Sequence, residues 1–198
     1  MPICPMSPGW SRPPNPPADS FTYAVPLPTV TKLKPNSGPV EGGTSVTITG
    51  TNFVGVTAVD FGSVAANGFK VNSATSITAE APKESVGVVD VRVVTSAGAS
   101  AISSKDHYKF APTITGVSPN AGSAVGGTSV TVQGTGFALG KTASVFTFGT
   151  TKATSANCAS STTCTVTAPA HAAGKVDVKV TVNKVTSPKT PADQYTYS

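Results

Sequence analysis

Short segments that alternate polar and apolar residues dominate the chain. Residues 45–49 and 129–133 alternate hydroxyl or amide side chains with Val or Ile, and the longer stretches 86–95 and 175–182 alternate in the same way. A period of two residues is typical of a strand with one buried face. Clusters of Gly and Pro separate these segments, and no stretch shows the 3.6-residue period of a helix. The pattern predicts an all-β protein with strands over these four ranges.

The same pattern occurs twice along the chain. The matching segments are 28–31 with 112–115, 42–48 with 126–132, and 89–91 with 176–178. The offset is 84 residues for the first two matches and 87 for the third, which places a three-residue insertion in the loop after Phe137. Such an insertion costs little, because the entropy of loop closure changes slowly with loop length. The sequence therefore predicts two repeats, 28–111 (repeat one) and 112–198 (repeat two).

Each repeat has the length and the turn spacing of a small β-sandwich. About seven short strands in ~85 residues, with turns every 8–12 residues, are typical of an immunoglobulin-like β-sandwich. The predicted fold is therefore all-β, with two tandem immunoglobulin-like β-sandwich domains. A Pro-rich leader, residues 1–27, precedes them.

The leader contains a segment that matches the end of the repeats. Residues 18–23 (ADSFTY) are similar to residues 192–197 (ADQYTY). We interpret this segment as a remnant of the final strand of a preceding repeat. An unpaired strand seeks a sheet edge, because its backbone donors and acceptors are free. The candidate assembly strand consists of Ser20, Phe21, Thr22 and Tyr23.

Several short motifs resemble those of the IPT/TIG domain. They are PNSGP (35–39), GGT (42–44) and VTITGTNF (46–53) in repeat one, and SPNAG (118–122), GGT (126–128) and GTGF (134–137) in repeat two. The resemblance implies an immunoglobulin-like fold. The family includes bacterial surface proteins, accessory modules of secreted polysaccharide-degrading enzymes, cell-surface receptors and some transcription factors. It does not specify the function, because one fold carries many functions.

Two of the three cysteines form a candidate disulfide. At the 87-residue offset, Cys158 and Cys164 fall on Val71 and Ile77 of repeat one. Two apolar positions on facing strand ends have thus become a cysteine pair, which predicts a bond that closes a small hairpin. Two buried free thiols are the alternative, whereas metal binding lacks further His or Cys ligands nearby. A disulfide indicates an oxidising compartment, and Cys4 in the leader has no predicted role.

Charge gives little support for a nucleic-acid or membrane partner. The net charge is +5, with seven Lys or Arg against six acidic residues in repeat one, and six Lys against two Asp in repeat two. The lysines are scattered and do not alternate with aromatic residues, as a nucleic-acid surface requires. We interpret them as solvated residues that protect sheet edges from aggregation. No segment has the ~20 apolar residues of a membrane span, and the leader lacks the apolar core of a secretion signal.

The sequence offers no recognisable catalytic, metal or cofactor site. His107 is matched by Gln194 in repeat two, and His171 lies in a predicted turn, so each is expected to be a solvated or edge histidine and not a catalytic base. No paired carboxylates, phosphate-binding glycine loop or calcium loop stands at a recognisable spacing. Aromatic residues that recur in both repeats are expected in the core, which argues against a dedicated sugar-binding face. They are Phe53 with Phe137, Phe61 with Phe148, Tyr108 with Tyr195, and Phe110 with Tyr197.

These observations favour a non-catalytic structural or spacer module of an extracellular or cell-surface multidomain protein. Self-association through the leader strand is a further hypothesis. The alternative is an accessory module for adhesion, which binds a polysaccharide or a surface protein. The expected partners are other domains of a longer chain or copies of the chain itself. A transcription factor is disfavoured, because the predicted disulfide does not suit the cytosol.

Overall fold

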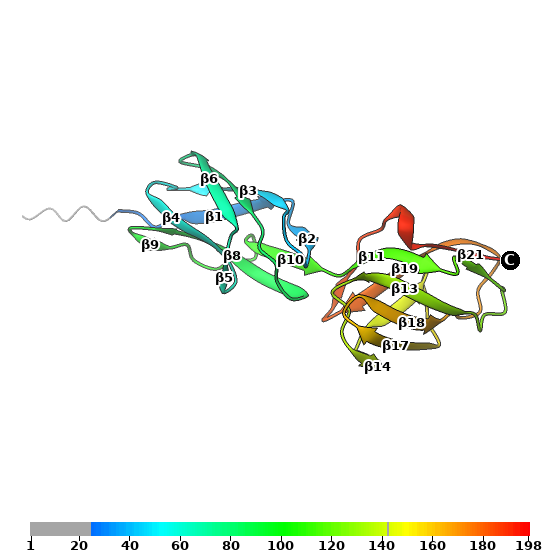
Figure 1. Ribbon diagram of the computed structural model, residues 1–198. Helices are drawn as coiled ribbons and strands as arrows, with labels where there is room; N and C mark the ends of the chain where they lie inside the picture. Colours follow the sequence, from blue (N-terminus) through cyan, green and yellow to red (C-terminus); the bar gives the residue numbers. More distant parts are fainter. Residues whose placement is uncertain (1–24, 142) are drawn as a thin grey trace, which may run out of the picture.

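A computed structural model describes residues 25–141 and 143–198 of the chain. Nearly all regular structure is β, arranged in two bodies that follow one another along the chain (Figure 1). The only helix in this part of the chain is the short 3-10 turn η1 (Pro191–Asp193). The predicted all-β fold with tandem sandwiches is confirmed. The candidate assembly strand, Ser20 to Tyr23, lies outside the described residues.

Repeat one is built from two sheets. The first has the strand order β1 (Thr29–Lys34), β3 (Ser45–Thr51), β7 (Ser76–Glu80) and β6 (Gly68–Ser73). The second has the order β2 (Ser37–Pro39), β10 (His107–Ala111), β8 (Gly87–Thr95), β4 (Val56–Phe61) and β5 (Val64–Ala65), with β9 (Gly98–Ala99) pairing β8. All pairs are antiparallel except β2 with β10. The order of these strands is that of a sandwich with non-sequential neighbours.

Repeat two has the same topology with one additional strand. Its first sheet has the order β11 (Thr113–Ser118), β13 (Ser129–Thr135), β18 (Thr163–Thr167), β17 (Ser155–Ser160) and β14 (Gly140–Lys141). Its second has the order β12 (Ala121–Gly122), β21 (Gln194–Tyr197), β19 (Gly174–Val182), β15 (Val145–Phe148) and β16 (Thr151–Lys152), with β20 (Val185–Thr186) pairing β19. The loop after Phe137, where the sequence places the insertion, thus supplies the edge strand β14.

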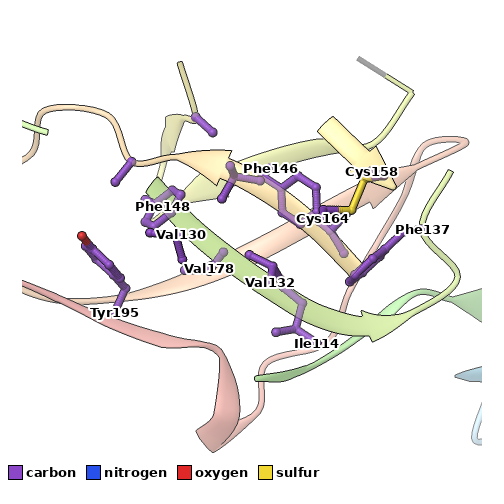
Figure 2. Packing of buried hydrophobic residues seen from close by; sticks show 14 of the residues in the cluster. Ile114, Val130, Val132, Phe137, Phe146, Phe148, Cys158, Cys164, Val178 and Tyr195 are labelled. Carbon is purple, nitrogen blue, oxygen red and sulfur yellow. A yellow bond between two sulfur atoms is a disulfide. The ribbon is translucent and has the colours of Figure 1, made fainter. Parts of the chain in front are cut away.

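The predicted alternation fixes which side chains enter the core. Along β3, Val46 and Ile48 are fully buried while the hydroxyl residues between them face solvent. The recurring aromatic residues are buried in both repeats, as expected. Phe61 packs edge-to-face on Tyr108, and Phe148 packs in the same way on Tyr195, with ring centroids 5.1 Å apart in each pair. Figure 2 shows the aromatic and aliphatic side chains that fill repeat two.

A disulfide joins Cys158 to Cys164 within the core of repeat two (Figure 2). The two residues are opposite one another on β17 and β18, with Cα atoms 3.9 Å apart. Val71 and Ile77 are opposite one another on β6 and β7, so the alignment made from the sequence is correct. Cys158 is 4% exposed, but Val71 is 40% exposed. The difference arises because β14 pairs with β17 and covers its edge, whereas β6 is an open edge.

Candidate functional site

The most distinctive feature of the molecule is the junction between its two repeats. Strand β10 ends at Ala111 and β11 begins at Thr113, so Pro112 is the single residue between them. Pro112 is buried. Proline holds φ near −65°, which removes one of the two soft dihedral angles of this link. The connection therefore restricts how one repeat turns relative to the other.

Side chains from both repeats meet beside this link. Val86 packs against the core clusters of both sandwiches. Asn183 of repeat two donates a hydrogen bond from Nδ2 to the carbonyl oxygen of Val86, at 3.1 Å. At Gly136 a Cβ atom would lie 2.9 Å from Cγ2 of Val86 and 3.1 Å from Cγ1 of Val40. The missing side chain at Gly136 therefore lets the two repeats come into direct contact.

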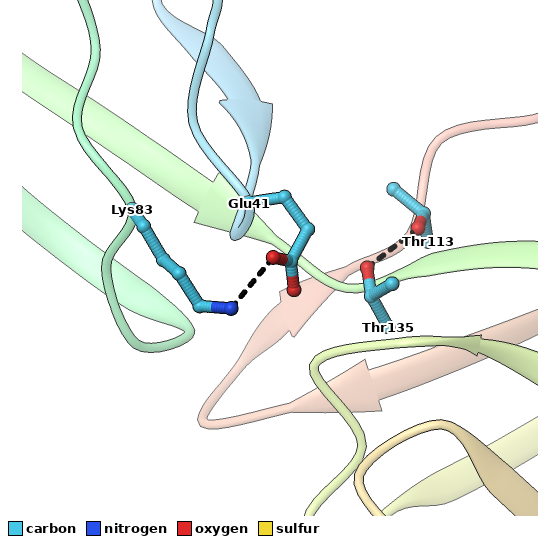
Figure 3. Close-up of polar contacts among 4 residues, drawn as sticks. All are labelled: Glu41, Lys83, Thr113 and Thr135. Carbon is cyan, nitrogen blue, oxygen red and sulfur yellow. Dashed lines mark hydrogen bonds and ion pairs between the residues drawn. The ribbon is translucent and has the colours of Figure 1, made fainter.

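Polar pairs lie around this contact (Figure 3). Lys83 Nζ and Glu41 Oε2 are 2.7 Å apart at the surface. The hydroxyls of Thr113 and Thr135 are 2.8 Å apart and hold β11 to β13 at the start of repeat two. Exposed ion pairs contribute about 0–1 kcal/mol, so the apolar contact of Val86 dominates. Grooves of about 320 and 430 Å³ flank the junction, and residues of both repeats line each of them.

The structure brings together one set of titratable side chains that the sequence spacing did not indicate. Asp90, Asp106 and His107 place their potential ligand atoms within 4.8 Å of one another. His107 Nε2 lies 3.3 Å from Asp90 Oδ1, because the two residues are opposite one another on β10 and β8. A cross-strand pair separated by 16 residues has no local sequence signature, which is why spacing alone missed it. His107 is exposed, as expected, but stands on an internal strand.

In repeat two, the corresponding aspartate pairs with a lysine instead of a histidine. Lys189 Nζ forms an ion pair with Asp177 Oδ2, and Asp177 is the counterpart of Asp90. Burial raises the pKa of the nearby Asp193 carboxyl above its usual value. His171 lies in the loop between β18 and β19, where it is half-buried and stacked on Tyr197 with ring centroids 5.1 Å apart. These contacts hold turns and strand ends together.

The comparisons with known proteins identify the family. The IPT/TIG domain family matches residues 28–110 and again residues 112–197. The chain belongs to the IPT/TIG domain family. No curated protein matches the chain. Among the described residues, no helix is long and apolar enough to cross a membrane.

Solved structures with similar folds come from longer proteins. The extracellular region of plexin A4 is 24% identical, covers 86% of this chain and 18% of its own, and gives a TM-score of 0.39. SGBP-B from a xyloglucan utilization locus of Bacteroides uniformis is 23% identical, and the match covers 85% of this chain and 49% of that protein, with a TM-score of 0.36. A surface glycan-binding protein of Prevotella bryantii is 18% identical, and the match covers 82% of this chain and 41% of that protein, with a TM-score of 0.42. The chain spans less than half the length of each of these proteins.

The motifs that characterise the IPT/TIG repeats serve the fold. Gly38 of the PNSGP motif lies beneath Tyr108 Oη and Thr44 Oγ1, and a Cβ at this position would overlap both atoms. Gly122 is placed in the same way beneath Tyr195 and Thr128. One glycine, one threonine and one core tyrosine thus pack together in each repeat. These motif residues pack against one another within each repeat, so they identify the family but do not indicate a ligand.

Proposed function

We propose that the two IPT/TIG repeats form a non-catalytic, rigid spacer of an extracellular multidomain protein. The observation that carries this proposal is the shared position of Val86, which belongs to the packing of both cores. Movement of one repeat against the other would expose this partly buried side chain, and would lose a fraction of the ~1.5–3 kcal/mol that full burial of a Val side chain contributes. The buried one-residue link at Pro112 also restricts movement of the two repeats, because so short a link allows little separation between them.

The orientation of the two repeats provides a direct test. In the native chain, residual dipolar couplings from both repeats should fit one alignment tensor. The Val86→Ala, Asn183→Ala double variant removes the apolar contact and the hydrogen bond, and its two repeats should require separate tensors. Ser96→Ala is the matched control, because Ser96 is the counterpart of Asn183 at the other end of repeat one. Separate tensors already in the native chain would refute a rigid spacer.

The buried disulfide supports the extracellular placement. Disulfides persist in oxidising compartments and are rare where thiols are kept reduced. The pair Cys158–Cys164 replaces the apolar pair Val71 and Ile77, so the fold does not require cysteines at these positions. Their presence is explained by a compartment in which the bond forms. Mass spectrometry of unreduced protein from the native source should show a two-hydrogen deficit within residues 158–164, and two free thiols there would contradict the placement.

We also propose that the chain self-associates by strand addition at β6. This edge strand is exposed at all six positions, and Phe69 and Val71 are 39% and 40% exposed. In repeat two the equivalent edge is covered by β14. An exposed apolar edge accepts a further strand, because its backbone groups are unpaired on one side. The leader segment 18–23, with Phe21 and Tyr23 alternating, has the pattern that such an edge accommodates.

Sedimentation across a wide concentration range tests this association. The full chain should associate with increasing concentration, and deletion of residues 1–24 should abolish the association. The Phe69→Lys, Val71→Lys variant should also be monomeric, because charged side chains block edge pairing. Val125→Lys is the control: Val125 is 83% exposed but does not lie on a sheet edge. A monomeric full chain, or association unaffected by both changes, would refute strand addition without affecting the spacer proposal.

A further inference from the structure

Basic side chains line an open groove of about 540 Å³ on repeat one. They are Lys32, Lys105, His107 and Lys109. Polar groups and one apolar residue complete the lining: Thr31, Leu33, Asn36 and Ser104. Lys32, Lys105 and Lys109 have no carboxylate within ion-pair distance in the described part of the chain. Within residues 25–141 and 143–198, Asp90 is the one carboxylate paired with a basic group of the groove, 3.3 Å from His107.

The local structure explains why these side chains share one groove. His107 and Lys109 are exposed on the outer face of β10, while Tyr108 and Phe110 between and after them are buried. Lys105 lies in the turn that leads into β10, two residues before His107. On the facing strand β1, the pairing shifts register between Val30 and Lys32. This bulge leaves Thr31 and Lys32 both exposed, because an extra residue re-aims its neighbours.

Repeat two contains the same groove, but with a single basic residue, Lys175. Its groove of about 330 Å³ is lined by the counterparts of the same positions, together with Lys175. The three lysines Lys32, Lys105 and Lys109 are replaced by Gly116, Ala192 and Thr196, in that order. Gln194 replaces His107. Asn120 and Thr115 match Asn36 and Thr31. The fold therefore produces the groove in both repeats, whereas the cluster of three lysines and a histidine is particular to repeat one.

Edge protection does not account for this charge. Lysines on edge strands discourage aggregation, and this explanation suits Lys32 on the edge strand β1. Strand β10, however, lies between β2 and β8, and Lys109 is paired on both sides. Lys109 therefore has no open edge to protect, and both His107 and Lys109 face the groove. Their position on an internal strand, facing a groove, is typical of a surface that meets a negatively charged partner.

We propose that this groove binds an anionic polysaccharide that carries carboxylate groups. Lysine ammonium groups donate to carboxylates in several directions, and three of them follow the groove. The side chains of Thr31, Asn36 and Ser104 supply hydrogen-bond partners for sugar hydroxyls. The lining contains no Phe, Tyr or Trp on which a nucleic-acid base would stack. This ligand-binding role is separate from the spacer function and does not depend on it.

Binding of polygalacturonate by the full chain tests the proposal. The Lys32→Gly, Lys105→Ala, Lys109→Thr variant transplants the residues of repeat two into repeat one. Each exposed charge contact changes affinity about two- to fivefold, so the triple variant should bind about tenfold or more weakly at low ionic strength. The salt dependence should fall by about 2 in its logarithmic slope, because fewer counterions are released. Dextran, which is neutral, should not bind to any variant.

Two further variants separate the groove from net charge. Lys70→Ala, Lys141→Ala, Lys152→Ala removes three exposed lysines outside the groove and should retain native affinity. The reverse transplant, Gly116→Lys, Ala192→Lys, Thr196→Lys, should add a second binding site and double the stoichiometry. No binding of polygalacturonate by the native chain would overturn the proposal, as would equal losses in the two lysine-depleted variants. Tighter binding of duplex DNA than of polygalacturonate at equal salt would overturn the assignment to a polysaccharide.

Discussion

The disulfide gives the sharpest quantitative prediction, because repeat one provides a matched reference for it. Cys158→Val, Cys164→Ile installs the pair that repeat one uses at these positions. The substitution removes the cross-link and keeps apolar side chains in the core. The bond closes a loop with a sequence separation of 6. In the chain-entropy treatment, such a short loop stabilises by about 2 kcal/mol.

The expected effect is confined to repeat two. For a domain of this size, 1 kcal/mol corresponds to about 4–8 °C in melting temperature, so the variant should lose about 8–16 °C. Peptide-resolved hydrogen exchange during heating, together with calorimetry, assigns the transition to a repeat. Strands β17 and β18 should lose protection first, whereas β6 and β7 should melt as in the native chain. Reduction of the native protein should reproduce the same shift.

Two outcomes would contradict this reasoning. Equal melting temperatures for the variant and the unreduced native protein would show that the bond adds no stability over an apolar pair. A parallel shift in both repeats would show that the junction couples their unfolding, so that the loss cannot be assigned to repeat two. The mirrored variant, Val71→Cys, Ile77→Cys, checks the loop argument independently. It should stabilise repeat one in oxidising buffer and lose this gain on reduction.

Three further predictions concern the core, high pH and neutral glycans. Gly38→Ala should destabilise repeat one by about 1–3 kcal/mol in urea titration, because its Cβ overlaps Tyr108 and Thr44, whereas Gly68→Ala, which meets no atom within 4 Å, should not. Burial raises the pKa of Tyr197 from 10.0 to about 12. The folded protein therefore favours the neutral phenol, and the free energy of unfolding should fall as the pH rises from about 10 to 12. Phenolate absorbance measures the titration. Pull-down on cellulose, chitin and starch should show no tight, saturable retention, since the recurring aromatic side chains are in the core.

The internal duplication made much of this fold predictable from sequence. Because the two repeats could be aligned, the facing positions of Cys158 and Cys164 followed from Val71 and Ile77, and the structure places both pairs opposite one another. The buried aromatic residues were predictable for the same reason. A position that stays aromatic in two otherwise divergent copies is constrained by packing, and these rings are buried.

The surface could not be predicted in this way. The insertion after Phe137 was visible in the sequence, but its role as a strand that covers β17 depends on pairing between distant segments. The lysines were interpreted as edge protection, which is incomplete for Lys109 because β10 proves to be an internal strand. The approach of His107 to Asp90 depends on cross-strand register. Each of these features arises from contacts between segments that local sequence patterns do not encode.

The parallel pairing of β2 with β10 has a mechanical consequence. The chain enters repeat one through β1 and leaves it through β10, at opposite ends of the sandwich (Figure 1). A pulling force along the molecule therefore slides β10 past β2 and loads the hydrogen bonds between residues 37–39 and 109–111 together. Bonds loaded together must break together, in contrast to a hairpin that opens one bond at a time. Because only Pro112 separates β10 from β11, tension passes to repeat two without an extensible segment that would absorb it.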